Sequence, residues 1–272
     1  ILAALLTVAA AVPAGAVSVV EVKSEKGISA YLAEDHSSQV VSVSFAFSGG
    51  TALDPLDKQG LSELGASLFN EGAGDLDSFA FQSALEDRAI TLGMSADLDT
   101  LRGSLTTTSP NLGEALRLTR LALLQPRIEP EAVERMRREL LVQIAARSEV
   151  PGRLATHKLY LELFGGHPYS REQEGTTETV QALTRADVQA WFKTRLARDR
   201  LLVGVSGDIG AERVRELLDT LFADLPAAGS GPSKAPPVKV STVGKTSRIF
   251  RDLTQSTIVM GAPGLLRSDP DW

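Results

Sequence analysis

The 272-residue chain contains no cysteine, which excludes disulfides, thiolate catalysis and cysteine-ligated zinc or iron–sulfur centres. It has only three histidines, His36, His157 and His167, and the closest two are ten residues apart. Two imidazoles therefore cannot lie on adjacent turns of one helix, as a helical HxxxH zinc motif requires. The sequence thus lacks the helical histidine pair of such a zinc site.

Positive charge is not in excess, since 28 Lys and Arg stand against 34 Asp and Glu, a net charge of −6. Phosphate binding needs clustered cations on one surface. The densest run of arginines, at 135–138, is interleaved with glutamates, a pattern typical of a solvated helix face. We therefore expect no nucleic-acid partner.

Long apolar runs are scarce, and the clearest one is residues 1–12. Pro13 follows it, and Ala-Gly-Ala at 14–16 fits an A-x-A cleavage site. About 12 apolar residues are too few for a membrane span, which needs roughly 20. We predict an incomplete signal peptide over residues 1–16, and hence an exported, periplasmic protein with no membrane span after cleavage.

Hydrophobic periodicity predicts an α+β fold. Val41, Val43, Phe45 and Phe47 alternate with small residues, which indicates a strand with one buried face. Further strands are expected at 19–22, 28–32, 91–96, 100–107 and 201–205. Helices are expected at 60–70, at 77–88, between Ser109 and Pro126, from Pro130, from Pro151 to about Phe164, after Thr184, and at 211–222. Because strands and helices do not alternate regularly, we expect a mainly antiparallel sheet with helices packed on one face.

The predicted organisation has four parts. After the signal peptide, one α+β domain is expected over residues 17–225. Residues 226–245 begin with a Gly-, Ser- and Pro-rich stretch that is typical of a linker. Residues 246–272 are expected to contribute strands at 247–251 and 256–261, the start of a second, truncated domain.

Five short motifs occur in a fixed order along the chain. The first is the segment 60–72, Gly-Leu-Ser-Glu-Leu-Gly-Ala-Ser-Leu-Phe-Asn-Glu-Gly. The others are the strand and turn at 45–50 with 59–60, His-Pro-Tyr at 167–169 with Gly-Thr at 175–176, Leu-Thr-Arg-Ala-Asp-Val at 183–188, and the strand end at 203–208. Together they resemble the pitrilysin/insulinase-like, mitochondrial-processing-peptidase-like M16 metallopeptidase family, over nearly the whole chain after residue 16.

The M16 resemblance implies a LuxS/MPP-like metallohydrolase fold and a zinc helix of the form G-x-x-H-x-x-E-H. In this chain Glu63 stands at the first histidine, Ala66 at the general base and Ser67 at the second histidine. Gln143 stands at the distal glutamate when Pro151 is aligned with the family's proline. The resemblance therefore implies that no catalytic or metal position is intact and that the chain holds no zinc of its own.

Three functions remain open on the sequence alone. The first is a non-catalytic subunit that forms a heterodimer with a zinc-bearing M16 peptidase and helps it to hold an extended peptide. The second is a peptide-binding or scaffold homodimer with no peptidase partner. The third, a zinc metalloendopeptidase in its own right, is disfavoured because no His-x-x-Glu-His or its inverse occurs in the chain.

Overall fold

The computed structural model describes residues 18–238, 240, 244–265 and 269–271. The predicted signal peptide at 1–16 lies outside these residues. Six strands form one sheet, in which only the β2–β6 pair is parallel. In spatial order they are β1 (Val19–Lys23), β2 (Ser29–Glu34), β6 (Leu201–Gly207), β3 (Val40–Ser48), β5 (Thr100–Thr108) and β4 (Thr91–Ala96). The expected mainly antiparallel sheet is confirmed.

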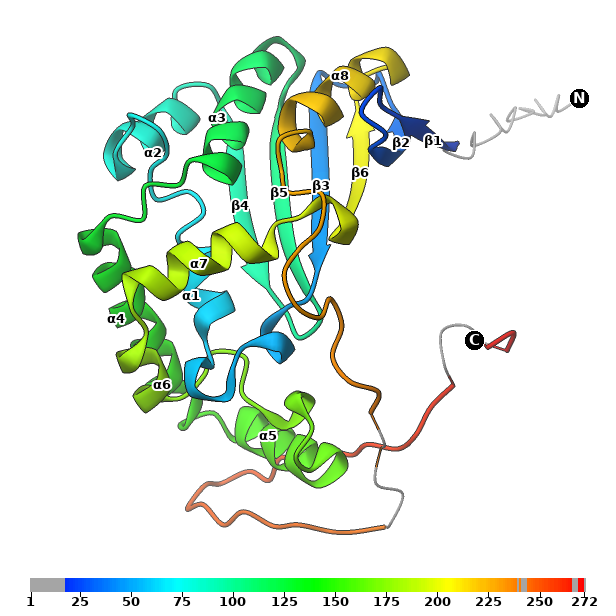
Figure 1. Ribbon diagram of the computed structural model, residues 1–272. Coiled ribbons are helices and arrows are strands. Elements are labelled where there is room, and N and C mark those ends of the chain that lie inside the picture. The colour runs from blue at the N-terminus through cyan, green and yellow to red at the C-terminus, as the bar shows by residue number, and fades with distance from the viewer. Residues whose placement is uncertain (1–17, 239, 241–243, 266–268, 272) are drawn as a thin grey trace, which may run out of the picture.

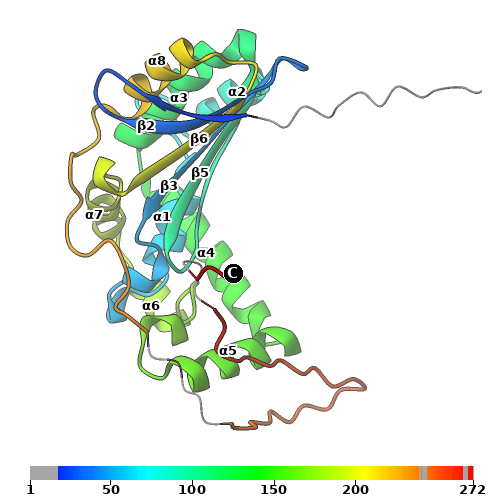
Figure 2. The ribbon, with the colours of Figure 1, turned by 90° about the vertical axis from the view of Figure 1, so that its right-hand side faces the viewer.

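Eight α-helices accompany the sheet in the part of the chain that the structure describes. They are α1 (Leu61–Ser67), α2 (Ser78–Glu86), α3 (Leu112–Leu124), α4 (Pro130–Arg147), α5 (Pro151–Phe164), α6 (Thr177–Ala182), α7 (Arg185–Arg195) and α8 (Ala211–Phe222). Figure 1 shows α3, α7 and α8 in front of the sheet, and α5 beyond its lower end. In the edge-on view of Figure 2, α7 and α8 lie to one side of the strands and α5 is again at the foot of the molecule. No helix among the described residues has the length and apolar character that a membrane crossing requires.

The central strand β3 has one face buried against the helices and one face exposed. Val41, Val43, Phe45 and Phe47 are all buried, whereas the residues between them are partly or fully exposed. The Phe45 ring lies 5.5 Å from that of Phe222 in α8, in an edge-to-face arrangement. The predicted period-two strand, with helices on one face of the sheet, is therefore confirmed.

Gly103 of β5 creates the space that the Phe45 ring fills. A Cβ atom added at Gly103 would lie 2.0 Å from Phe45 Cε2, closer than any real contact allows. Gly93, on the neighbouring strand β4, has no atom within 4 Å of where a Cβ would lie. One glycine is therefore required by packing and the other is not.

Several local expectations met different outcomes. The capping box at Thr184 is confirmed, because its side chain accepts from the backbone N–H of Asp187. Helix α6 was not expected, although Thr176 forms a second capping box there. Ser109, a residue type that often caps a helix, does not cap the helix expected after it, because its hydroxyl bonds to the Asp208 carboxylate of the β6–α8 loop instead. A distant partner thus overrode a local preference.

The two strands expected at 247–251 and 256–261 are absent from the structure. No described residue after Gly207 belongs to a strand, since neither segment meets a sheet edge with which it could form a ladder. The chain instead contacts α5, where Ser247 Oγ donates to Glu162 Oε1 at 3.1 Å. The predicted linker also begins in contact with the first domain, because Arg200 donates to the carbonyl oxygens of Ser230 and Gly231. The boundaries of the linker and of a second domain stay predictions.

We expect Gly103→Ala to lower the free energy of unfolding by roughly 1–3 kcal/mol, because the added methyl overpacks the Phe45 ring. Gly93→Ala is the matched control on the adjacent strand and should change stability by less than about 0.5 kcal/mol. Urea unfolding followed by circular dichroism measures both. Equal effects of the two substitutions would show that Phe45 is not packed against β5 in this way.

Candidate functional site

Helix α1, the candidate zinc helix, is held at its start by a side chain from outside the helix. Gly60 precedes it with φ +89° and has no side chain with which to cap the helix. The buried Asp54 carboxylate takes that role, accepting from Ser62 N at 2.9 Å and from Ser62 Oγ at 2.6 Å. Burial raises the pKa of Asp54 to about 6, even though the Ser62 hydrogen bonds and Arg195, 3.5 Å away, act in the opposite direction.

Trp191 of α7 fixes the other side of α1. Its Nε1 donates to Ser62 Oγ at 3.1 Å, and its ring lies directly against Gly65, where a Cβ would come within 2.6 Å. Only glycine allows so close an approach at that position. Asp54, Ser62 and Trp191 therefore form one connected, buried hydrogen-bond network that sets the place and direction of α1.

The four residues implied by the M16 resemblance lie on two helices that pack together, α1 and α4. Glu63 and Ser67 are four residues apart on α1, and both are half-buried. Ala66 is buried, and its methyl group can accept no proton. Ser67 Oγ donates to Leu64 O of its own helix at 2.9 Å. Gln143 is exposed on α4, which packs against α1.

Glu63 has an unusual electrostatic environment. No hydrogen bond or ion pair joins its carboxylate to another part of the described chain. Burial raises its pKa to about 7, with further contributions from the carboxylates of Glu174, Asp54 and Asp97. Nothing nearby compensates its negative charge, so the group sits in a site that disfavours the ionised form.

Beside Glu63 lies a set of ion pairs that the sequence analysis missed. Arg147, at the end of α4, contacts Glu174 at 3.1 Å and Glu172 at 3.3 Å. Arg153 and His157 of α5 contact Glu174 at 2.9 Å and Glu172 at 2.8 Å, respectively. No sequence signal reveals these pairs, because their partners are 15 to 27 residues apart and on separate elements. The set joins α4, α5 and the 172–174 loop next to α1.

The residues present do not fit a zinc ion. The described part of the chain has no group of three or more His, Cys, Asp or Glu side chains placed to hold a metal. His36 lies beside Asp208 at 2.7 Å, and His167 Nε2 lies 2.8 Å from Pro236 O. Both imidazoles thus have local structural partners, as His157 has in Glu172. Within α1 itself only Glu63 resembles a metal ligand, and a single carboxylate is not a catalytic zinc site.

Strand β4, against which α1 packs, forms one edge of the sheet. Asp97 N donates to Thr100 O at 2.9 Å, which makes Asp97 and Thr100 a hydrogen-bonded pair at the β4–β5 turn. Since such pairs alternate along an antiparallel ladder, the N–H and C=O groups of Leu92, Met94 and Ala96 must point away from β5. Outward backbone groups at an open edge can pair with another extended chain.

The β4–β5 turn is built by two acidic residues, Asp97 and Asp99. Asp97 Oδ1 accepts from Asp99 N at 3.0 Å and from Thr100 N at 2.8 Å. Tyr169 Oη donates to Asp99 Oδ1 at 2.6 Å, and burial, followed by that contact, raises the pKa of Tyr169 to about 12. The turn is therefore a fixed structural feature.

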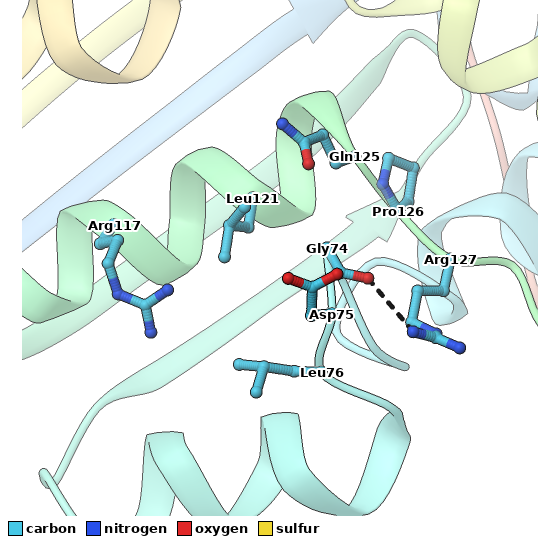
Figure 3. A pocket seen from close by; sticks show the side chains of 8 residues that line it. All are labelled: Gly74, Asp75, Leu76, Arg117, Leu121, Gln125, Pro126 and Arg127. Carbon is cyan, nitrogen blue, oxygen red and sulfur yellow. Dashed lines mark hydrogen bonds between the residues drawn. The ribbon is translucent and has the colours of Figure 1, made fainter.

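A hollow of about 590 Å³ lies between α3 and the loop before α2 (Figure 3). Its lining combines apolar and charged side chains: Gly74, Asp75, Leu76, Arg117, Leu121, Gln125, Pro126 and Arg127. Both guanidinium groups are already paired, Arg117 with Glu114 and Arg127 with Glu129, and Arg127 also donates to Gly74 O. Both cations of the hollow are therefore already compensated, and we assign it no role.

We expect the substitution Glu63→Gln to stabilise the fold more at pH 8 than at pH 5. With a pKa raised to about 7, folded Glu63 keeps a proton that the unfolded chain releases near pH 4.5, so stability falls as pH rises through this window. Glutamine removes the ionisation. The gain at pH 8 relative to pH 5 should be on the order of 1–3 kcal/mol by urea unfolding.

Glu139→Gln, at an exposed position of α4, is the control and should show no such difference between the two pH values. Asp54 ionises in an overlapping range, so each variant is compared with the native chain at the same pH. A gain from Glu63→Gln that is equal at pH 5 and pH 8 would contradict the burial argument.

Comparison with known proteins supports the M16 resemblance. A family profile described as "Peptidase M16 inactive domain" matches residues 182–272. The chain is 25% identical over 231 residues to the non-peptidase homolog YmxG of Helicobacter pylori, covering 85% of this chain and 53% of that protein. It is 26% identical to the probable mitochondrial-processing peptidase subunit beta of Schizosaccharomyces pombe, covering 53% of this chain and 32% of that protein. The chain thus spans about half the length of these relatives or less.

Solved structures agree in fold. The peptidase M16 inactive domain from Pseudomonas fluorescens superposes with a TM-score of 0.73 at 21% identity, covering 82% of this chain and 53% of that one. The periplasmic protease PqqL from Escherichia coli gives 0.72 at 14% identity, covering 82% and 26%. The chain is thus similar to peptidase M16 proteins, through a profile that describes an inactive domain and a relative named as a non-peptidase homolog, and the solved structures show that it shares their fold.

Proposed function

We propose that this chain is the non-catalytic partner of a zinc-bearing M16 peptidase and that it holds an extended peptide along the free edge of β4. The observation that carries the proposal is the pairing of two features at one place. Helix α1 keeps its position through the Asp54–Ser62–Trp191 network, while the groups that would act on a peptide are missing from it. The open strand edge beside it remains.

Hydrolysis by this chain alone is not supported. A metallopeptidase needs a metal to polarise the carbonyl and lower the pKa of water, and a base to take the proton. At the corresponding places we assign Glu63, Ala66, Ser67 and Gln143, of which only Glu63 can ionise. Zinc would then belong to the partner subunit and not to this chain.

The β4 edge suits an extended peptide better than a folded ligand. Strand addition draws its affinity from main-chain hydrogen bonds and therefore accepts many sequences. Natural edge strands are commonly protected by Lys, Pro or a bulge, but the six residues of β4 are Thr-Leu-Gly-Met-Ser-Ala. Such an edge can bind a second chain through its backbone.

The partner and the compartment follow from similarity and from the sequence. One relative is named as a subunit of a processing peptidase, and one structural neighbour is a periplasmic protease. The apolar run and Ala-Gly-Ala at the start of the chain support export to the periplasm. We place the assembly there, as a heterodimer that processes or degrades peptides.

The assembly is tested with the zinc-bearing M16 peptidase of the same organism and a fluorogenic peptide substrate. We expect the native chain to raise kcat/KM of that peptidase. Ala96→Pro removes the outward N–H of β4 but leaves its ladder to β5 intact, and proline is tolerated at such edge positions. This variant should lose most of the increase, roughly tenfold, while still binding the partner in gel filtration.

Ala96→Ser keeps the N–H and is the matched control, with an increase equal to that of the native chain. If the native chain neither binds the peptidase nor changes its rate, the heterodimer is wrong. A homodimer that binds peptide without any peptidase would then be the function of this fold. If Ala96→Pro stimulates as well as the native chain, the peptide does not lie along β4.

The assignment of the four lost positions is tested by restoring them. We expect the fourfold variant Glu63→His, Ala66→Glu, Ser67→His and Gln143→Glu to retain one equivalent of zinc through gel filtration, because it recreates two imidazoles and a distal carboxylate. The native chain should retain none. The same variant with Gln143 unchanged is the control and should bind zinc more weakly.

Zinc content is measured by atomic emission, and folding by circular dichroism. A correctly folded fourfold variant that holds no more zinc than the native chain would show that the positions are misassigned. One tightly bound equivalent in the native chain would contradict the loss of the site.

A further inference from the structure

We infer that Asn70 determines which part of β4 a peptide can pair with, and so sets the length and register of the bound segment. The inference rests on the proposed binding at the β4 edge and adds to it a residue with a defined role. Asn70 follows α1, and its side-chain Nδ2 donates to Leu92 O of β4 at 3.2 Å. The donor thus occupies the place that a peptide N–H would take in strand addition.

The direction of the Leu92 carbonyl is fixed by two independent observations. The hydrogen-bonded pair Asp97–Thr100 requires every second residue of β4 to face outward, and Leu92 is one of these. The Asn70 contact, made from outside the sheet, shows the same direction. Asn70 therefore caps an edge group and not a group within the ladder.

Asn70 is itself held in place from its other side. Gln82 Nε2 of α2 donates to the Asn70 backbone carbonyl at 2.9 Å. Phe69, directly before it, is fully buried, with its ring 6.4 Å from that of Phe45. The amide thus comes from a fixed backbone and does not swing freely into the edge.

The opposite end of the edge is closed by the β4–β5 turn. Asp97 N is used by Thr100 O, and Asp97 O accepts from Thr51 N at 2.8 Å. Between the two closed ends lie the N–H and C=O groups of Met94 and Ala96, which have no hydrogen-bond partner in the described part of the chain. A peptide can pair fully with these two residues only, which takes about three of its own residues because paired positions are two apart.

Peptide length is therefore the variable to test. The probes are two fluorescein-labelled peptides of alternating threonine and valine, four and seven residues long, with the same terminal lysine and the same net charge. Their binding to the purified chain is followed by fluorescence anisotropy. For the native chain we expect the two dissociation constants to agree within about twofold, because the longer peptide gains no further full pair.

Asn70→Ala removes the donor and frees Leu92 O. In this variant the seven-residue peptide should bind roughly three- to tenfold more tightly than the four-residue peptide, as one added backbone hydrogen bond allows. Asn70→Asp keeps the size of the side chain but has no N–H to donate, and should show the same length dependence if the alanine variant folds poorly. Affinity for the four-residue peptide should stay as in the native chain.

Two negative results have different meanings. If both peptides bind and the length dependence is the same in the native chain and in the Asn70 variants, Asn70 does not limit the edge and only this inference fails. If the native chain already prefers the longer peptide by tenfold, it also fails. If neither peptide binds any of the proteins, the β4 site of the proposed function is wrong, and the role of Asn70 fails with it.

Discussion

The buried hydrogen bonds from Asp54 and Trp191 to Ser62 are the constraint on which the rest of the site depends. Helix α1 has seven residues, far fewer than an isolated helix needs in order to persist in water. Its conformation must therefore come from tertiary contacts, and these reach it from the preceding loop and from α7. Removing one partner would leave a buried donor or acceptor unpaired, at a cost of about 1–3 kcal/mol.

The residues that hold α1 in place differ from the residues at the positions implied for catalysis. Asp54, Ser62, Gly65 and Trp191 fix α1, and none of them is at a position where the M16 resemblance places a ligand or a base. The positions implied for catalysis can change without loss of this hydrogen-bond network, because none of their side chains takes part in it. The β4 edge and Asn70 are placed by the same helix, so they too persist when the catalytic residues are lost.

The sequence predicted most of the fold because most of its signals are local. The alternation in β3, the prolines that open α4 and α5, and the Thr184 capping box each depend on neighbours within a few residues. What it missed depends on distant partners. Ser109 bonds to Asp208, and the segments at 247–251 and 256–261, which were expected to be strands, pair with no edge of the sheet.

In the candidate site, too, the sequence predicted the local features and missed those that depend on distant partners. Register along α1 was enough to assign Glu63, Ala66 and Ser67 to one helix, and spacing was enough to assign Gln143 to another. The charges around Glu63 were not predictable, because Glu174, Arg147 and Arg153 come from three separate elements. Neither was Asn70, since a side-chain amide that caps a strand edge leaves no pattern in the sequence.

The environment of Glu63 also bears on how α1 persists without catalytic residues. A half-buried carboxylate that forms no ion pair is costly when ionised, and proteins relieve that cost by raising the pKa. At a pKa of about 7, Glu63 is protonated about half of the time at neutral pH. Helix α1 then presents an alanine, a serine whose hydroxyl is satisfied within the helix, and a partly neutral carboxyl. These side chains include neither a histidine nor a second carboxylate, which agrees with our proposal that the neighbouring strand edge acts through main-chain pairing.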